Sequence, residues 1–124
     1  MKYIKIIFVV LMMGIIFLFS SCNATISSLQ SDMIVIFLRD LIPVNSFIVR
    51  KLAHFSLFFI LATSIYLFSK SYILSLSLSS LYAIFDEFHQ YFVPGRSCEL
   101  RDMLIDISGV VVALIIIKLV EVLK

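Results

Sequence analysis

The chain has 124 residues, of which 62% are hydrophobic and 15% are charged, and its formal net charge is +2. A soluble globular domain needs a much more polar surface than this composition supplies, so a lipid bilayer is the expected solvent. The small net charge and the lack of a Lys/Arg cluster with interleaved aromatic residues exclude nucleic acid as a partner.

Four apolar runs approach the roughly 20 residues that a helix needs to cross about 30 Å of hydrocarbon. They cover residues 4–19, 52–68, 72–93 and 103–123. The sequence therefore predicts an all-α, polytopic membrane protein with about four transmembrane helices in a single domain over residues 1–124. Leu and Ser alternate from Leu74 to Ser79, but in so long an apolar run a helix is favoured over a strand.

The first apolar run sets the orientation. Lys2 and Lys5 precede it, and no further Lys or Arg occurs until Arg39, which favours a cytoplasmic N-terminus in a multi-pass protein of the cell membrane. The same pattern, followed by serines and Cys22, also fits a secretory or lipoprotein signal. Retention as a helix is the prediction, and it makes the Ser/Thr-rich residues 20–31 an external loop.

Two further features fall on the outer side in this topology. Residues 33–49 are apolar but are interrupted by Arg39 and Pro43, so they predict an interfacial or re-entrant segment rather than a span. Cys22 and Cys98 are also external. Their spacing does not decide between a disulfide and two free thiols.

Strongly polar residues gather at the outer ends of the apolar runs. An ionisable group near the centre of a membrane helix costs about 2.5–3.5 kcal/mol, so such a cluster predicts a site. Asp102 and Asp106 are four residues apart and share a helix face, which continues to the small residues Gly109 and Ala113. We expect a cleft lined by His54, Asp86, His89, Asp102 and Asp106, with Arg96 over its mouth.

Three segments of the sequence resemble a known family. They are Arg50–Phe55 (RKLAHF), Tyr82–Ser97 (YAIFDEFHQYFVPGRS) and Arg101–Gly109 (RDMLIDISG). In these segments, and over nearly its whole length, the chain resembles the VanZ-like family of small bacterial integral membrane proteins. Asp-Glu-x-His-Gln followed by Pro-Gly-Arg is the most specific motif. The resemblance implies a role in low-level resistance to the glycopeptide teicoplanin.

The second apolar run departs from the family pattern. Members commonly carry Glu-Tyr and a later Gly where this chain has Leu57, Phe58 and Ala62. A carboxylate of the expected cleft is therefore missing here. Its loss implies altered activity if that Glu is catalytic in relatives, and little change if it only orients His54.

The polar residues suggest chemistry or binding at a lipid head group. The candidate catalytic residues are His54, Asp86, His89 and Asp106, in which a His paired to a carboxylate would act as acid or base on a lipid or lipid-linked cell-wall precursor. The candidate ligand-binding residues are Glu87, Gln90, Arg96, Asp102 and Lys51, with Arg96 as a bidentate phosphate ligand.

Other interpretations of the cluster stay open. The residue types permit a divalent metal, but without a His-x-x-x-His motif the sequence predicts no metal and no cofactor. A cleft that binds a lipid head group or the glycopeptide itself needs no catalysis. Alternatively, buried ion pairs only hold the helices together as a scaffold. Whether the protein is an enzyme is not decided by the sequence.

Overall fold

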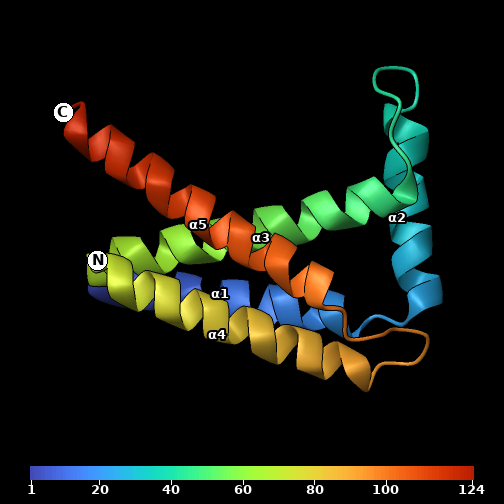
Figure 1. Ribbon diagram of the computed structural model, residues 1–124, viewed down its shortest axis with the longest axis horizontal. Coiled ribbons are helices and arrows are strands. Elements are labelled where there is room, and N and C mark those ends of the chain that lie inside the picture. Colours follow the sequence, from blue (N-terminus) through green and yellow to red (C-terminus); the bar gives the residue numbers. More distant parts are fainter.

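The computed structural model describes residues 1–124, and all of its regular structure is helical. Helices α1, α3, α4 and α5 run along the long axis, whereas α2 stands across them at one end (Figure 1). Both chain termini lie at the opposite end (Figure 1). The five helices are α1 (Lys2–Ser21), α2 (Ala24–Leu38), α3 (Ser46–Ser69), α4 (Tyr72–Tyr91) and α5 (Leu100–Val122).

The prediction of an all-α membrane protein is confirmed, but the predicted count of about four spans is not. Helices α1, α3 and α5 are long and apolar enough to cross a membrane. Helix α4 is not among them, because serines and a polar C-terminal end dilute its apolar residues. The structure therefore supports three spans by length and composition, where the sequence predicted about four.

Helix α4 carries its polar face inward and its apolar face outward. Ser75, Ser79 and Asp86 are buried, whereas Ile73 and Leu81 are largely exposed. The Ser75 hydroxyl donates a hydrogen bond of 2.6 Å to the Ala62 carbonyl of α3. The Leu/Ser alternation is thus helical, as predicted, and Ser75 bonds a neighbouring helix, which lipid could not do.

Helices α3 and α5 cross in close contact around a glycine. A Cβ atom on Gly109 of α5 would overlap the carbonyl oxygen of Phe55 on α3. Ala113 continues this face of α5 and is fully buried, and Phe58 of α3 is fully buried beside it in the same core cluster. Small residues allow such close approach of helix backbones, so the predicted Gly109/Ala113 face is a helix contact.

The Ser-rich residues 20–31 are helical for the most part, so the prediction of an external loop there is wrong. Helix α2 begins after Asn23, whose side chain accepts a hydrogen bond of 2.9 Å from the Ile26 amide. Ser27 and Ser31 are buried on the inner side of α2, and the Ser31 hydroxyl donates to the Ser27 carbonyl at 2.9 Å. The Asn23 cap and the inward-facing serines therefore stabilise a helix where the Ser-rich composition alone suggests a loop.

The region predicted as one interfacial segment, residues 33–49, is divided in the structure. Its first part completes α2, its middle is a loop, and its end begins α3 at Ser46 instead of at residue 52. The Asn45 side chain caps α3 by accepting from the Ile48 amide at 3.0 Å. His54 consequently lies in the third turn of α3.

Candidate functional site

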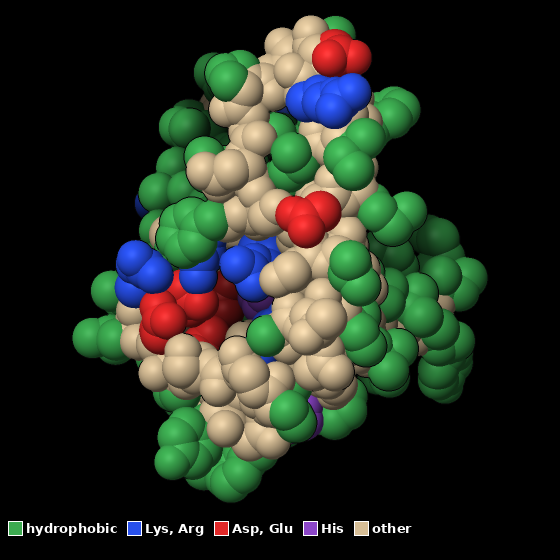
Figure 2. Space-filling model, turned by 90° about the vertical axis from the view of Figure 1, so that its right-hand side faces the viewer, with side chains coloured by type: hydrophobic (Ala, Val, Ile, Leu, Met, Phe, Trp, Pro, Cys, Tyr) green, Lys and Arg blue, Asp and Glu red, His purple; other side chains and the backbone are tan.

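A polar cleft opens at the end of the bundle where α2 crosses. Figure 2 shows acidic and basic side chains gathered in one hollow on this face, with apolar side chains around it. The cavity has a volume of about 280 Å³ and lies among α3, α5 and the loop between α4 and α5. Its lining residues are Ala24, Phe47, Arg50, Lys51, His54, Gln90, Gly95, Arg96, Ser97, Glu99, Arg101, Asp102 and Ile105.

An apolar cavity adjoins this cleft. It has a volume of about 300 Å³, lies between α2 and α3, and includes Ile34, Val49 and Ile60 in its wall. Arg50, His54 and Arg96 line both cavities, so the polar cleft and the apolar cavity meet at these three side chains. One ligand with a charged part and an apolar part would fit this arrangement.

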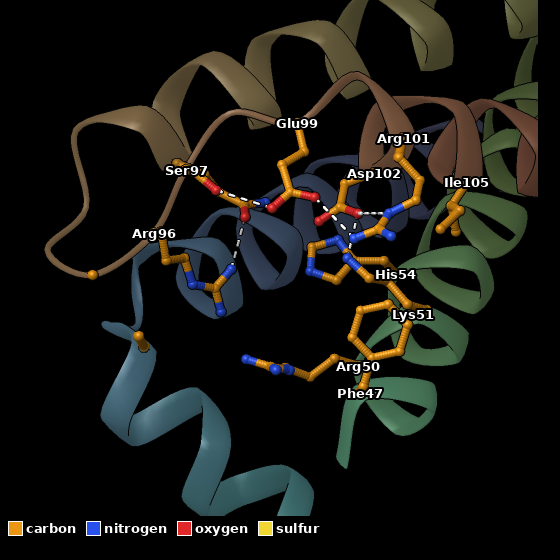
Figure 3. Close-up of a pocket in the computed structure, with 13 residues that line it drawn as sticks. Phe47, Arg50, Lys51, His54, Arg96, Ser97, Glu99, Arg101, Asp102 and Ile105 are labelled. Atoms are coloured by element: carbon orange, nitrogen blue, oxygen red, sulfur yellow. Dashed lines mark hydrogen bonds and ion pairs between the residues drawn. The ribbon is translucent and has the colours of Figure 1, made fainter. Parts of the chain in front are cut away.

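The cleft carries a surplus of positive charge near Arg50 and Arg96. The side chains of these two arginines extend into the same open space (Figure 3). Burial, followed by the charge of Arg50, lowers the pKa of Arg96. An arginine stays protonated nonetheless. Arg50 forms no ion pair and no side-chain hydrogen bond within the protein, so its donors are free for an anion.

Arg96 is held in place by a turn and by two hydrogen bonds. Gly95 adopts φ 76°, and a Cβ there would lie 2.9 Å from the Ala24 Cβ, so a larger residue would push the loop from α2. Arg96 donates to the Gln90 Oε1 at 2.8 Å and to the Ser27 hydroxyl at 2.6 Å. These contacts tie the loop to α4 and α2 and leave part of the guanidinium facing the cleft.

Buried carboxylates lie beneath the cleft and link it to α3 and α5. Lys51 forms an ion pair with Asp102, and one turn deeper the His54 Nδ1 lies 3.5 Å from the Asp106 Oδ1. The Asp106 side chain is completely buried. These two charge pairs lie on the same faces of α3 and α5 as the contact of Gly109 with Phe55. The close crossing of the helices and the charge pairs therefore depend on each other.

Two further carboxylates come from α4. Asp86 accepts a hydrogen bond of 3.0 Å from the Gln90 amide, which in turn accepts from Arg96. Glu87 is fully buried, and its Oε2 accepts from the Glu99 backbone amide at 3.0 Å. These hydrogen bonds from Arg96 to Gln90 and from Gln90 to Asp86 connect the arginine at the rim of the cleft to the buried carboxylates beneath it.

The sequence matches the VanZ/LLP1 family over residues 5–121. The chain belongs to the VanZ/LLP1 family. No significant match was found among curated proteins or among solved structures. The three segments that resemble the family meet at the cleft, since they supply Arg50 and His54, then Gln90 and Arg96, then Asp102. With three apolar helices of spanning length, this VanZ/LLP1 chain is a membrane protein.

His89 differs most from its predicted position in this VanZ/LLP1 protein. Its Nε2 lies 3.0 Å from the Ser21 hydroxyl, and its ring stacks on Phe17 at 4.5 Å. It therefore packs against α1 and does not line the cleft or pair with Asp86. The prediction that joined His89 to the other four residues is wrong in this respect, because the inward face of α4 passes through Asp86 and Gln90.

The remaining predicted residues lie at or beneath the cleft, and the structure adds others. Lys51, His54, Gln90, Arg96 and Asp102 line it, whereas Asp86, Glu87 and Asp106 are buried below. Arg50 was not predicted from the sequence, although its position four residues before His54 places it on the same helix face. Ser27, Ser97, Glu99 and Arg101 were also missed; Ser27 was obscured by the prediction of a loop.

The structure also places the two cysteines and Leu57. Cys22 and Cys98 are both free thiols, so no disulfide closes the loop over the cleft. Leu57, the position at which the resemblance implied a missing Glu, lines the apolar cavity and not the polar cleft. That wall is therefore apolar in this chain.

Proposed function

We propose that the cleft binds an anionic, phosphate-bearing lipid. Arg50 and Arg96 would hold the phosphate, and an acyl or polyprenyl chain would occupy the apolar cavity. The observation that supports this most directly is that a cationic cleft and an apolar cavity share Arg50, His54 and Arg96. A phospholipid and a lipid-linked cell-wall precursor both carry these two chemical parts.

We also propose a membrane topology that fits lipid binding at the cleft. With the N-terminus in the cytoplasm and α4 as a fourth span, the cleft would face the outer side of the membrane, where cell-wall precursors are displayed. The exposed apolar face of α4 supports a membrane position for this helix. The predicted domain over residues 1–124 would then be one bundle of four spans, with α2 lying across it.

Lipid binding is tested by replacing Arg50 with glutamine. The purified protein in detergent is incubated with phosphatidylglycerol or phosphatidylcholine, and native mass spectrometry counts the lipid that stays bound. We expect retention of phosphatidylglycerol by the wild type and about tenfold weaker binding by Arg50→Gln, since a hydrogen bond to a charged group contributes about 1.5–3 kcal/mol. A polyprenyl phosphate serves as the second probe. It shows whether the cleft binds a phospholipid or a lipid-linked cell-wall precursor.

The matched control is Arg39→Gln, which removes the same charge from an exposed loop residue. This variant should bind lipid like the wild type. Equal binding by Arg50→Gln and wild type would contradict the proposal. It would also favour the scaffold interpretation, in which the polar cluster has no ligand.

We further propose that lipid binding contributes to low-level glycopeptide resistance, as membership of the VanZ/LLP1 family suggests. A lipid-linked precursor held in the cleft would be displayed differently to teicoplanin. A sensitive Gram-positive host expressing the wild type is expected to tolerate more teicoplanin than a host carrying Arg96→Gln, at equal membrane levels by immunoblot. His89→Ala, outside the cleft, should keep the resistance. No resistance from the wild type would contradict this role.

Modification of the bound lipid is the second candidate function. His54 lines the cleft and pairs with the buried Asp106, which is an arrangement that suits a general acid or base. Asp86 lies beside this pair, whereas His89 lies apart from it, against α1. A phosphatidylglycerol or polyprenyl phosphate that is recovered chemically unchanged after incubation with the protein would favour binding without turnover.

A further inference from the structure

Three side chains from three different helices converge beneath the cleft. His54 of α3, Asp86 of α4 and Asp106 of α5 each offer one ligand atom, and these atoms all lie within 4.8 Å of one another. Asp86 is 1% exposed and Asp106 is 0% exposed, so water does not compete for these carboxylates. The sequence predicted that these three residues share one cleft, and the structure brings their ligand atoms within reach of a single ion.

The carboxylates of this cluster have too few hydrogen-bond donors around them. Neither oxygen of Asp106 has a hydrogen-bond partner, although a buried carboxylate normally finds several. Glu87 adds a third buried carboxylate nearby, and one of its oxygens is also without a partner. His54, whose imidazole is charged only when protonated, is the only basic side chain within ion-pair distance of Asp106. Two carboxylates and one imidazole would balance a divalent cation.

We propose that His54, Asp86 and Asp106 bind a divalent metal ion beneath the cleft. Imidazole and carboxylate ligands suit zinc or manganese, and three protein ligands leave a position for a water or a bound ligand. Zinc ligands lie about 2.0–2.2 Å from a tetrahedral ion, which places them about 3.4 Å apart, so the ligand atoms must approach each other by up to about 1.4 Å on binding. His54 lines the cleft, so the open position would face it.

A neighbouring amide supports this assignment. Gln90 donates to the Asp86 Oδ2 at 3.0 Å, which is the kind of hydrogen bond that orients a metal-ligating carboxylate. Arg96 fixes Gln90 in turn. The proposal does not depend on lipid binding, because the three ligands lie below Arg50 and need no phosphate to complete them.

Metal binding is tested on the full-length protein in detergent. The wild type is stripped with EDTA, desalted, and dialysed separately against Zn²⁺ and Mn²⁺, and the bound metal is measured by mass spectrometry. We expect one ion per chain for at least one of the two metals. Asp106→Asn should lower the affinity at least tenfold, whereas Asp40→Asn, the same change at an exposed loop residue, should leave it unchanged.

A second measurement covers the case in which Asp106→Asn does not fold. Binding to the native state raises the melting temperature as the metal concentration increases, so the stripped wild type should melt higher when the metal that binds is added. A folded wild type that binds neither ion stoichiometrically would overturn the proposal. Undiminished binding by folded Asp106→Asn would overturn it as well, since the metal would then lie at another site.

Discussion

Replacing Gly109 with leucine is expected to prevent the protein from forming a stable bundle in detergent. The Cβ of any larger residue would overlap the Phe55 carbonyl oxygen, and a backbone atom cannot rotate away as a side chain can. Overpacking in a core costs about 1–3 kcal/mol for modest additions, and leucine adds a whole branched side chain. Gly109→Ala should therefore lower the melting temperature, and Gly109→Leu should leave little monodisperse protein.

The control for this prediction is the corresponding change in α1. A Cβ atom added to Gly14 would have no other atom within 4 Å, so Gly14→Leu should melt like the wild type or slightly higher. Size-exclusion chromatography after heating measures both variants. If Gly109→Leu stays as monodisperse as Gly14→Leu, the close crossing of α3 and α5 does not hold the bundle together.

The same crossing explains which part of the site could be predicted from the sequence. Asp102, Asp106, Gly109 and Ala113 follow a spacing of three or four residues, which keeps them on one face of any helix. The residue types then decide what that face can contact, since small residues permit a neighbouring backbone and carboxylates need partners. The contact of this face with the helix that carries His54 could therefore be predicted from the sequence.

The position of His89 shows where helical spacing fails as a guide. Residues three and four apart both count as neighbours on a helix, so by spacing His89 and Gln90 are equally able to join Asp86. They diverge around the axis, because three residues rotate by about 300° and four by about 400°. The structure turns Gln90 inward and His89 toward Phe17 of α1. Tertiary contacts decide between them, since His89 packs on α1 and Gln90 also bonds Arg96.

Helix α2 could not be predicted for a different reason. Serine favours caps and turns in isolated segments, so residues 20–31 resemble a loop when considered locally. In the protein, Ser27 bonds Arg96, which lies on a loop far away along the chain. The α2 wall of the apolar cavity therefore depends on tertiary contacts, and the combination of a cationic cleft with an apolar cavity was not visible in the sequence.

The pair of His54 and Asp106 is expected to show strong energetic coupling. His54→Leu would leave the completely buried Asp106 carboxylate without the imidazole that pairs with it, and breaking a buried ion pair in this way costs about 3–5 kcal/mol. Adding Asp106→Asn removes the stranded charge, so the double variant should be more stable than His54→Leu alone. Unfolding is measured in the presence of EDTA, so that no metal ion contributes to the difference.

The pair one turn nearer the cleft mouth provides the comparison. Lys51 and Asp102 keep 20% and 24% of their side chains exposed, so water partly solvates either charge when its partner is removed. The same double-mutant cycle with Lys51→Leu and Asp102→Asn should give a coupling of about 1 kcal/mol or less. If the deep pair couples no more strongly than this one, Asp106 is solvated or protonated in the folded protein. A stronger coupling at His54 and Asp106 would mean instead that water is excluded beneath the cleft, so that an unpaired charge there lowers the stability of the folded protein.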